Sequence, residues 1–326
     1  MALLDAYRQQ VALLVRVLPF VASEPEFALK GGTAINLFIR DMPRLSVDID
    51  LTYLPITDRP SSLVAIDAAM LRMAGQITAG IKGAKVTPSR LQPDNKITKL
   101  VVRHERVQIK IEVTPVLRGA VYAAEMRAVA PRVEEAFGFA EIQVTSFADL
   151  YAGKIVAALD RQHPRDLFDV RDLLANEGID DALRSAFLIY ILSHPRPIAE
   201  LLAPTRRDLD DEYARGFVGM TDKAVPLEAL IETREAIIAA MIGDMPDAHR
   251  SFLLGFKQGA PDWAALGMEE AARLPAVQWK IRNLEQLPED RRLGLASRLA
   301  KVLYPHSKNR EPWAERIREV DRNQRD

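Results

Sequence analysis

The sequence predicts an α/β (α+β) fold with a mixed sheet, followed by an all-α C-terminal half. Segments in which apolar and polar residues alternate, as in strands, occur early in the chain between helix-like segments. Beyond Asp180 the apolar residues follow only the helical period. With 326 residues and 48% hydrophobic content, the chain is long enough for two domains. We place them at residues 1–145 and 146–326.

Residues 1–20 form the first predicted element, an amphipathic helix. The segment is apolar but carries Asp5, Arg8 and Arg16 at helical intervals, which excludes the pattern of a signal peptide. No segment reaches the roughly 18 uncharged apolar residues of a membrane span. Cysteine is absent, so disulfides and thiolate metal sites are excluded. We therefore expect a soluble, cytoplasmic protein that does not contact a membrane.

The next segment predicts a short strand, a glycine turn and a helix. Residues 27–29 lead into Gly31 and Gly32, and a helical pattern follows from Thr33 to Asp41. Pro43 ends this helix. Residues 45–53 then alternate with a period of two, which predicts a strand.

The alternation in this strand separates two faces. The apolar face holds Leu45, Val47, Ile49 and Leu51, and the polar face holds Ser46, Asp48 and Asp50. A helix is predicted at 61–81, and strands at 96–103 and 107–113 form an antiparallel hairpin. In the second hairpin strand Glu112 points to a polar face.

Two consecutive helices are predicted after residue 145. Ser146 and Asp149 resemble a capping box, which opens a helix that runs to about Arg161. His163 and Pro164 break it, and a second helix covers 165–176. Later helical segments include 227–242 and 291–303.

Asp48 and Asp50 are candidate metal ligands. Side chains two apart on a strand lie about 6.6 Å apart on one face, so both carboxylates can approach the same hard cation. Mg²⁺ favours one or two carboxylates together with substrate phosphate oxygens. A third carboxylate would complete a two-metal site that activates an attacking oxygen and stabilises a leaving pyrophosphate. Glu112 is the candidate.

Gly31, Gly32 and Thr33 are candidates for binding a triphosphate, because glycines allow close backbone approach and a helix start offers N–H donors. Taken alone, the D-x-D pattern is more typical of a solvated sheet face, and a glycine pair is usually a turn. The two lie one short helix apart, and both aspartates share a face. This combination favours a catalytic site.

These residues also resemble a known family. The stretch LKGGTAINLFIRDMPRLSVDIDLTY resembles the first motif of the AbiEii/AbiGii-type nucleotidyltransferase toxins, which belong to the DNA polymerase β-like superfamily. The resemblance continues through IKIEV and DLYAGKIVAALDRQHPRDLFDVRDLL, and covers roughly residues 25 to 175. It implies a nucleotidyltransferase fold and the toxin of a type IV toxin–antitoxin system, with a cognate antitoxin. Some members of the family add nucleotides to the 3′ end of tRNA and so halt translation.

The resemblance also implies roles for individual residues. Gly32 and Thr33 would contact the triphosphate, Asp48 and Asp50 would bind metal, and Lys154 would reach the nucleotide's phosphates. The family's third acidic position varies, which leaves Glu112 the least constrained. From its position alone, Lys154 emerges at the edge of a buried helix face, where the alternative is an ordinary surface lysine.

Arg165, Asp166 and Asp169 follow at the junction of the two helices. Arg165 could pair with Asp169 four residues on and rigidify the turn, or the junction could bind substrate. Asp166 could instead orient Lys154 or a metal-bound water. Ser46 shares the face of the aspartates, and its phosphorylation would add about two negative charges there and inhibit the enzyme. The alternative is an unmodified strand serine.

A nucleic-acid surface must be local, because 44 Lys+Arg against 45 Asp+Glu give a formal charge of -1. Strand alternation could spread the basic residues of the hairpin over two faces. The candidates are Lys96, Lys99, Arg103, Arg106 and Lys110, with Arg206, Arg207, Arg291 and Arg292 in the helical half. An aromatic content of 6% disfavours an extensive single-strand stacking platform. Contact with a folded RNA end fits better.

The sequence therefore predicts a Mg²⁺-dependent nucleotidyltransferase that transfers a nucleoside monophosphate from an NTP to tRNA. No motif encodes which NTP base is preferred. One alternative acceptor is a protein hydroxyl or a small molecule. Another alternative is a catalytically inactive binding module, although crowded carboxylates argue against it.

Overall fold

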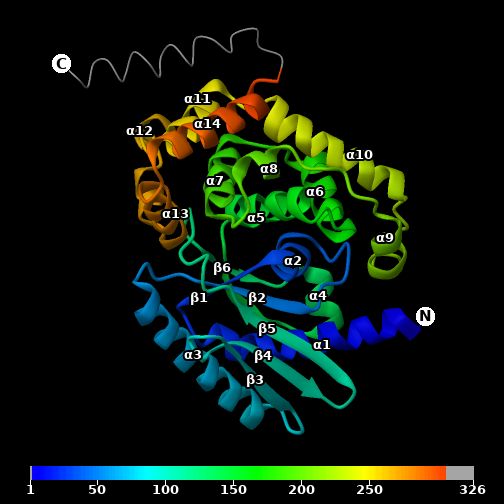
Figure 1. The fold of residues 1–326 in the computed structure, drawn as a ribbon. Coiled ribbons are helices and arrows are strands. Elements are labelled where there is room, and N and C mark those ends of the chain that lie inside the picture. Colours follow the sequence, from blue (N-terminus) through cyan, green and yellow to red (C-terminus); the bar gives the residue numbers. More distant parts are fainter. Residues whose placement is uncertain (1, 306–326) are drawn as a thin grey trace, which may run out of the picture.

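A seven-stranded mixed sheet organises the first half of the chain in the computed structural model, which describes residues 2–305 (Figure 1). The strand order is β3-β4-β5-β2-β1-β7-β6, in which β2/β5 and β1/β7 are parallel pairs and the others antiparallel. The predicted mixed sheet is confirmed. The strands are β1 Phe27–Lys30, β2 Asp48–Tyr53, β3 Lys85–Leu91, β4 Lys96–His104, β5 Val107–Val113, β6 Glu125–Ala128 and β7 Glu141–Val144.

Two long helices, α1 (Ala2–Ala22) and α3 (Arg59–Gly80), lie along the lower side of the sheet in Figure 1. The short helix α4 (Pro131–Phe137) precedes β7. Ile49, Leu51 and Ile111 are buried in the core. Because side chains alternate along a strand, the polar residues between them face the opposite side, toward the helical half.

Strand β1 passes directly into helix α2 (Gly31–Ala34), which continues as a π-helical turn, Ile35–Ile39. No separate glycine turn lies between strand and helix. Gly31 makes the change of direction with φ of +75°, in the left-handed region that favours glycine. The predicted strand–glycine–helix order is therefore confirmed, with Gly31 at the junction.

Strand β2 begins at Asp48, three residues later than predicted. The segment before it is held by the helical half instead: Arg44 forms an isolated bridge with Thr221, and the Leu45 amide donates to the Met220 carbonyl at 3.0 Å. Strands β3, β6 and β7 were not predicted. β3 and β6 are mostly exposed edge strands without an apolar alternation, and β7 is only four residues long.

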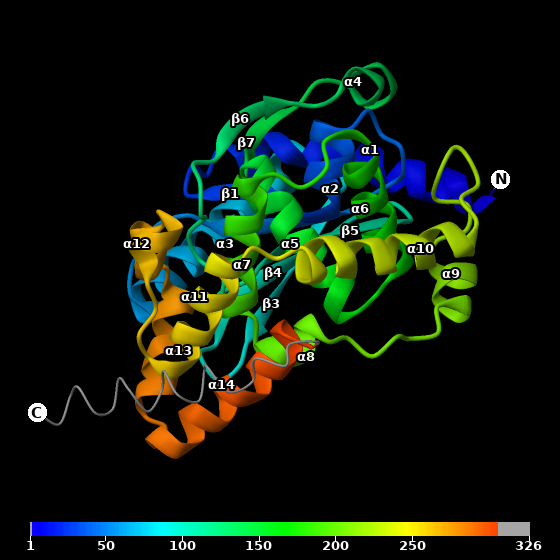
Figure 2. The same cartoon turned by 90° about the horizontal axis from the view of Figure 1, so that it is seen from above.

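Among the described residues, every element after residue 146 is helical, as predicted. Ser146 caps α5 (Phe147–Asp160), since its hydroxyl oxygen accepts from the Asp149 amide at 3.0 Å. Figures 1 and 2 show α10, α11 and α14 on the outer side of α5 to α7. The remaining elements are α6 Pro164–Asn176, α7 Asp181–Ser193, α8 Ile198–Leu202, α9 Asp210–Gly216, α10 Leu227–Ile238, a π-helix Ala239–Gly243, α11 Asp247–Gln258, α12 Trp263–Leu266, a 3-10 helix Glu269–Arg273, α13 Pro275–Glu285 and α14 Glu289–Leu303.

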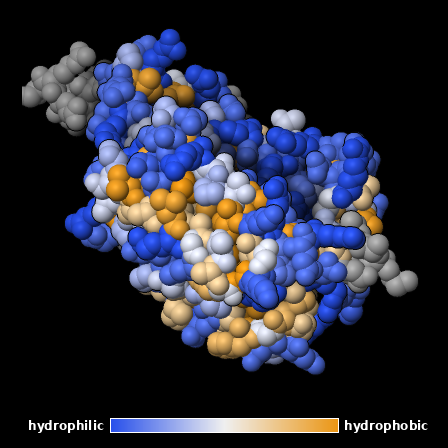
Figure 3. All heavy atoms as spheres, turned by 90° about the horizontal axis from the view of Figure 1, so that it is seen from below, coloured by the Kyte–Doolittle hydropathy of each residue, from blue (hydrophilic) through white to orange (hydrophobic). Residues whose placement is uncertain are grey.

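The division into two domains at residues 145 and 146 stays a prediction. It falls in the connection between β7 and α5, and residues 306–326 of the second domain lie outside the described residues. Within 2–305, no helix combines the length and apolar character needed to cross a membrane. The face in Figure 3 carries separate apolar patches among hydrophilic residues.

Candidate active site

A row of charged residues crosses the sheet on one face. Strand pairing places Lys30 of β1 beside Asp50 of β2, Asp50 beside Glu112 of β5, and Glu112 beside Lys99 of β4. Residues that pair across neighbouring strands share a face. Asp48, two residues before Asp50 on the same strand, therefore lies on this face too, and the register brings all three predicted carboxylates together.

Asp50 is the most strongly perturbed carboxyl of this row. Burial raises its pKa, Lys30 opposes that rise, and Asp48 and Glu112 add to it. Burial also lowers the pKa of Lys30. Glu112 is differently placed, because its carboxylate forms an ion pair of 2.6 Å with Lys99, and both side chains are partly exposed.

Asp48 and Asp50 fit a magnesium ion, whereas the three carboxylates do not form a ready-made cage. Across residues 2–305, no three His, Asp or Glu side chains are grouped to hold a metal. Mg²⁺ needs only one or two protein carboxylates when phosphate oxygens and water complete its shell. The carboxylates of Asp48 and Glu112 act on Asp50 alongside the stronger opposing charge of Lys30, so a metal ion here would bind beside a lysine.

Gly31 and Gly32 are both required by close contacts. A Cβ atom at Gly31 would lie 2.8 Å from Oδ2 of Asp50. A Cβ atom at Gly32 would lie 2.8 Å from Nη2 of Arg44 and 3.0 Å from Oγ of Ser46. A side chain at Gly31 would therefore displace the Asp50 carboxylate, whereas one at Gly32 would displace side chains of the segment before β2.

Thr33 is almost fully buried, and its hydroxyl forms hydrogen bonds within the protein. It donates to the backbone carbonyl of Asp48 and lies 3.0 Å from Oγ of Ser46. Both bonds fasten the start of β2 to α2. Ser46 itself is half-buried in the segment before β2, so it reaches the aspartates through Thr33 rather than through strand alternation.

Lys154 is a buried lysine rather than a surface lysine, with 6% of its side chain exposed. Its Nζ lies 2.9 Å from Oδ1 of Asp166 and 3.0 Å from Oδ2 of Asp169. An ammonium group has three N–H donors, and the two carboxylates use two of them. Because Lys154 also lines the cleft beside Asp50, one donor remains for a ligand there.

Asp166 and Asp169 belong to a buried ion network that joins the sheet to the helices. Burial opposes their ionisation, but Lys154 and a guanidinium group on each outweigh it and hold both pKa values below 3.8. The guanidinium is that of Arg161 for Asp166 and that of Arg44 for Asp169.

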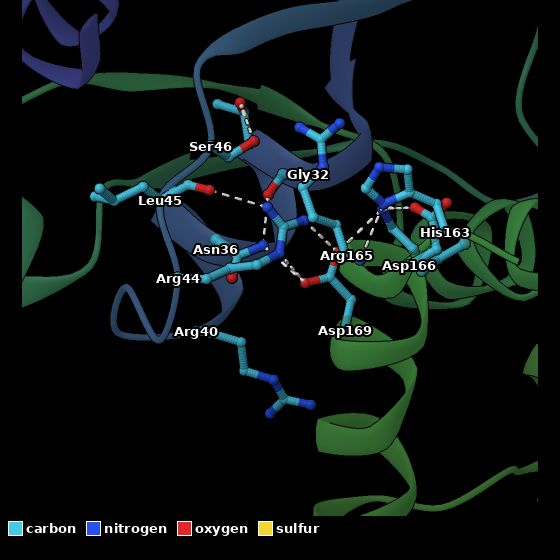
Figure 4. Close-up of polar contacts among 12 residues, drawn as sticks. Gly32, Asn36, Arg40, Arg44, Leu45, Ser46, His163, Arg165, Asp166 and Asp169 are labelled. Carbon is cyan, nitrogen blue, oxygen red and sulfur yellow. Dashed lines mark hydrogen bonds and ion pairs between the residues drawn. The ribbon is translucent and has the colours of Figure 1, made fainter. Parts of the chain in front are cut away.

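The predicted ion pair between Arg165 and Asp169 is wrong. The carboxylate of Asp169 is occupied by Arg44 and the side-chain amide of Asn36 (Figure 4). Lys154 binds it as well. Arg165 is only partly buried, and its backbone amide donates to Nδ1 of His163. A buried carboxylate takes the cations enclosed with it rather than an exposed one on its own helix. The alternative in which Asp166 orients Lys154 matches their 2.9 Å contact.

A large cleft lies between the charged sheet face and the helical half, with about 2670 Å³ of empty space that includes open solvent. Gly31 and Asp50 line it from the sheet side, and Lys154 lines it from α5. Residues from three separate segments therefore meet at one opening, where a nucleoside triphosphate could be held against carboxylates. Asp48 and Glu112 are not part of the lining.

The basic hairpin residues divide between the two faces of the sheet, as alternation suggested. Lys110 pairs in register with Asp48, and Lys99 and Arg103 belong to the same face. Lys96 instead forms an ion pair of 3.4 Å with Asp67 of α3 on the covered side. Three of the five candidates thus accompany the carboxylates.

Sequence reasoning missed Lys30 and Arg44. Lys30 directly precedes the glycine pair, and a lysine next to a predicted phosphate turn was an available signal. Arg44 offered no signal, because its partner Asp169 is 125 residues away in the chain.

Comparisons with known proteins bear on the family and the fold of the chain. A family model described as "Nucleotidyl transferase AbiEii toxin, Type IV TA system" matches residues 12–283. No curated protein sequence matches the chain. Among solved structures, MenT4, a nucleotidyltransferase toxin from Mycobacterium tuberculosis H37Rv, is similar with a TM-score of 0.57 and 18% identity. The match covers 85% of this chain and 93% of that one, and at this identity it shows the fold alone.

Proposed function

Because the chain belongs to the AbiEii family of nucleotidyltransferase toxins of type IV toxin–antitoxin systems, we propose that it transfers a nucleoside monophosphate from an NTP to the 3′ end of tRNA with the help of Mg²⁺. The observation that carries this proposal is the convergence of Gly31, Asp50 and Lys154 on one cleft. The cleft offers a carboxylate, a close backbone approach and an ammonium donor. These are the groups that hold a triphosphate for attack.

In the proposed reaction the 3′ hydroxyl oxygen of the acceptor attacks the α-phosphorus of the NTP. The bond from that phosphorus to the oxygen bridging to the β-phosphate breaks, and pyrophosphate leaves. Asp48 and Asp50 would hold Mg²⁺, which supplies charge stabilisation when bound. The backbone of Gly31, Gly32 and Thr33 and the free donor of Lys154 would position the triphosphate.

Glu112 is the proposed third carboxylate, either as a metal ligand that completes a two-metal site or as the base that accepts the hydroxyl proton. Its register beside Asp50 supports this role. The ion pair with Lys99 must open first. Because both partners are partly exposed, opening it costs little, about 1 kcal/mol or less.

Asp166 and Asp169 are proposed as positioning residues, since both hold the Lys154 ammonium beside the cleft. Arg165 is proposed only as support for the junction between α5 and α6, through its backbone amide, which donates to Nδ1 of His163. The helical domain from residue 146 onward completes the cleft in this proposal, through Lys154 and the faces of α7 and α13.

Regulation is proposed at two levels. Membership of the family implies a cognate antitoxin as partner. Ser46 is the proposed modification site, because its hydroxyl lies 3.0 Å from Thr33 Oγ1 and so within the contacts that fasten β2. A phosphate there would repel the carboxylates. Mass spectrometry that finds Ser46 unmodified whenever a partner suppresses activity would count against it.

One assay tests the proposed function. The protein is incubated with Mg²⁺, total tRNA and each labelled NTP in turn, and the labelled product is identified. Label in RNA from wild type, and none from Asp48→Ala, is the expected result. Asp211→Ala is the matched control, because Asp211 forms a largely exposed surface ion pair with Arg215. Label in protein, or in a small molecule without RNA, would replace tRNA with the alternative acceptor. Unchanged transfer by Asp48→Ala would remove the assignment of the site.

A further inference from the structure

The cleft extends well beyond the groups assigned to the triphosphate. Its volume of about 1120 Å³ lies slightly above the roughly 300–1,000 Å³ typical of a site for one small ligand. The far wall is formed by one face of α13, which contributes Pro275, Gln278, Trp279 and Arg282. A second ligand can therefore lie beside the NTP.

Exposed apolar side chains gather in this part of the cleft. Ile56, Val116 and Trp279 are 53%, 52% and 47% exposed, and all three line it. They come from the segment after β2, the segment after β5, and α13. Large apolar side chains left in solvent from three separate segments mark a binding surface rather than a packing defect.

The start of α13 is anchored to these loops. Leu274, which precedes α13, and Ile56 both approach Gly119, where an added Cβ would lie 2.6 Å and 3.3 Å from their side-chain atoms. Trp279 therefore sits on a helix that is fixed against the sheet half. The Nζ of Lys280 lies 5.3 Å from the centre of its indole ring, so a cation covers one face of the ring.

Two guanidinium groups accompany the indole. Arg273 and Arg282 line the same wall and are exposed. Arg273 has a surface ion pair with Glu270, and Nε of Arg282 donates to the Gln278 carbonyl at 3.3 Å. Over the whole cleft, the lining holds seven Lys or Arg residues and four Asp, a balance that favours a polyanion.

An aromatic ring beside cations is the arrangement that binds single-stranded nucleic acid, with a base on the ring and backbone phosphates on the cations. The phosphates of the NTP are assigned to Lys154 and the glycine backbone. Arg273 and Arg282 take no part in that assignment, so they can contact the phosphates of a second ligand. We propose that Trp279 stacks on a base in the single-stranded 3′ end of the acceptor RNA, while Arg273 and Arg282 contact its backbone.

This inference rests on the proposed function, since it assigns the acceptor end of the same site. It agrees with the low aromatic content of the chain, because one ring suffices for one base. The remaining surface needs no extended stacking platform.

Binding without catalysis tests the inference. The probe is a fluorescein-labelled RNA hairpin with a short single-stranded 3′ tail, and the same hairpin with a blunt end is its control. Anisotropy is measured without NTP or Mg²⁺. Trp279→Ala is expected to weaken binding of the tailed hairpin about 5- to 150-fold, and Trp279→Phe is expected to weaken it less. Binding of the blunt hairpin should change little.

Phe139→Ala is the matched control variant, because Phe139 is an aromatic residue 61% exposed outside the cleft. It should bind both hairpins like wild type. Arg273→Ala and Arg282→Ala should each reduce the salt dependence of binding by about one phosphate contact. Thermal unfolding confirms that each variant is folded. We expect all of them to fold, because substitutions at exposed positions change stability little.

Two results would overturn the inference. In the first, Trp279→Ala binds the tailed hairpin as tightly as the wild type does. The first result also includes the case in which neither the wild type nor the variant binds this hairpin. The other is a raised KM for the NTP with unchanged affinity for the hairpin, which would assign the ring to the base of the NTP. Neither outcome bears on Asp48→Ala, so failure of the inference and failure of the proposed reaction are distinguishable.

Discussion

Arg44 and Asp169 form a bidentate ion pair in the protein interior, with Nε to Oδ1 at 2.7 Å and Nη2 to Oδ2 at 2.5 Å. Their side chains are only 3% and 1% exposed. The pair joins the segment before β2 to α6, and the same carboxylate binds Lys154. The position of the Lys154 ammonium beside Asp50 therefore depends on a contact between the two halves of the chain.

Removing this carboxylate is expected to destabilise the protein strongly. Asp169→Ala would leave Arg44 buried without its bidentate partner, and loss of one member of a buried pair typically costs about 3–5 kcal/mol. Urea unfolding measures the change. Arg165→Ala, one turn away on the same helix, should change the free energy of unfolding by no more than about 0.5 kcal/mol. Among the described residues the Arg165 guanidinium forms no ion pair, and only its backbone amide donates to His163. Equal effects of the two substitutions would contradict the network.

The same network predicts loss of stability in acid. Asp166 and Asp169 have pKa values below the ordinary 3.8 in the folded protein. The unfolded chain therefore binds more protons as the pH falls. The contribution of these two carboxylates to the free energy of unfolding should be complete above about pH 5. It should decline as the pH falls through about 4 and lower. Asp166→Asn should show a shallower decline than wild type in urea titrations at a series of pH values, whereas Asp211→Asn should follow wild type.

Gly31→Ala should impair both stability and transfer. The new side chain would occupy a left-handed φ, which costs roughly 1–2 kcal/mol, and would also lie 2.8 Å from Asp50 Oδ2. Displacing a reacting group by about 1 Å can reduce turnover about 100-fold. Gly178→Ala separates the two effects, because Gly178 has φ of +72° and nothing within 4 Å of an added Cβ. It should lose stability alone. Normal transfer by Gly31→Ala would show that the Asp50 contact is not needed.

Asp50→Asn should abolish transfer without lowering the melting temperature of the metal-free protein. Burial, Asp48 and Glu112 together outweigh the attraction of Lys30 and raise the pKa of Asp50, so neutralising this carboxyl does not cost stability. Mg²⁺ with a non-hydrolysable NTP analogue should raise the melting temperature of wild type by mass action, and should not do so for Asp50→Asn. A thermal shift that survives the substitution would place the metal elsewhere.

The candidate site could be predicted largely because its signals are local. Strand alternation alone puts Asp48 and Asp50 on one face, and Gly31 marks a change of chain direction that needs φ above zero. The family resemblance added Lys154. Glu112 was assigned to a polar face, but only the register of β2 with β5 brings it beside Asp50.

What escaped prediction depends on distant contacts. The residues before Asp48 alternate like a strand, but Leu45 bonds to Met220 from the helical half. Strand β3 contains Pro88 and mostly exposed side chains, so an edge strand of this kind has no hydrophobic period. We predicted Arg165 as the partner of Asp169 because helical spacing identifies only residues that are close in the chain. Arg44, the partner in the structure, comes next to Asp169 only when the whole chain has folded.

The position of β1 in the sheet also determines how early during translation the sheet can be completed. β1 lies between β2 and β7, and Leu29 pairs with Val144, whose strand emerges from the ribosome more than a hundred residues later. Lys154, Asp166 and Asp169 follow later still. At about 5–20 residues per second, the growing chain carries Asp48 and Asp50 for several seconds with neither a finished sheet nor a cleft. On the proposed function, a nascent chain of this design cannot transfer nucleotides until its second half has been translated.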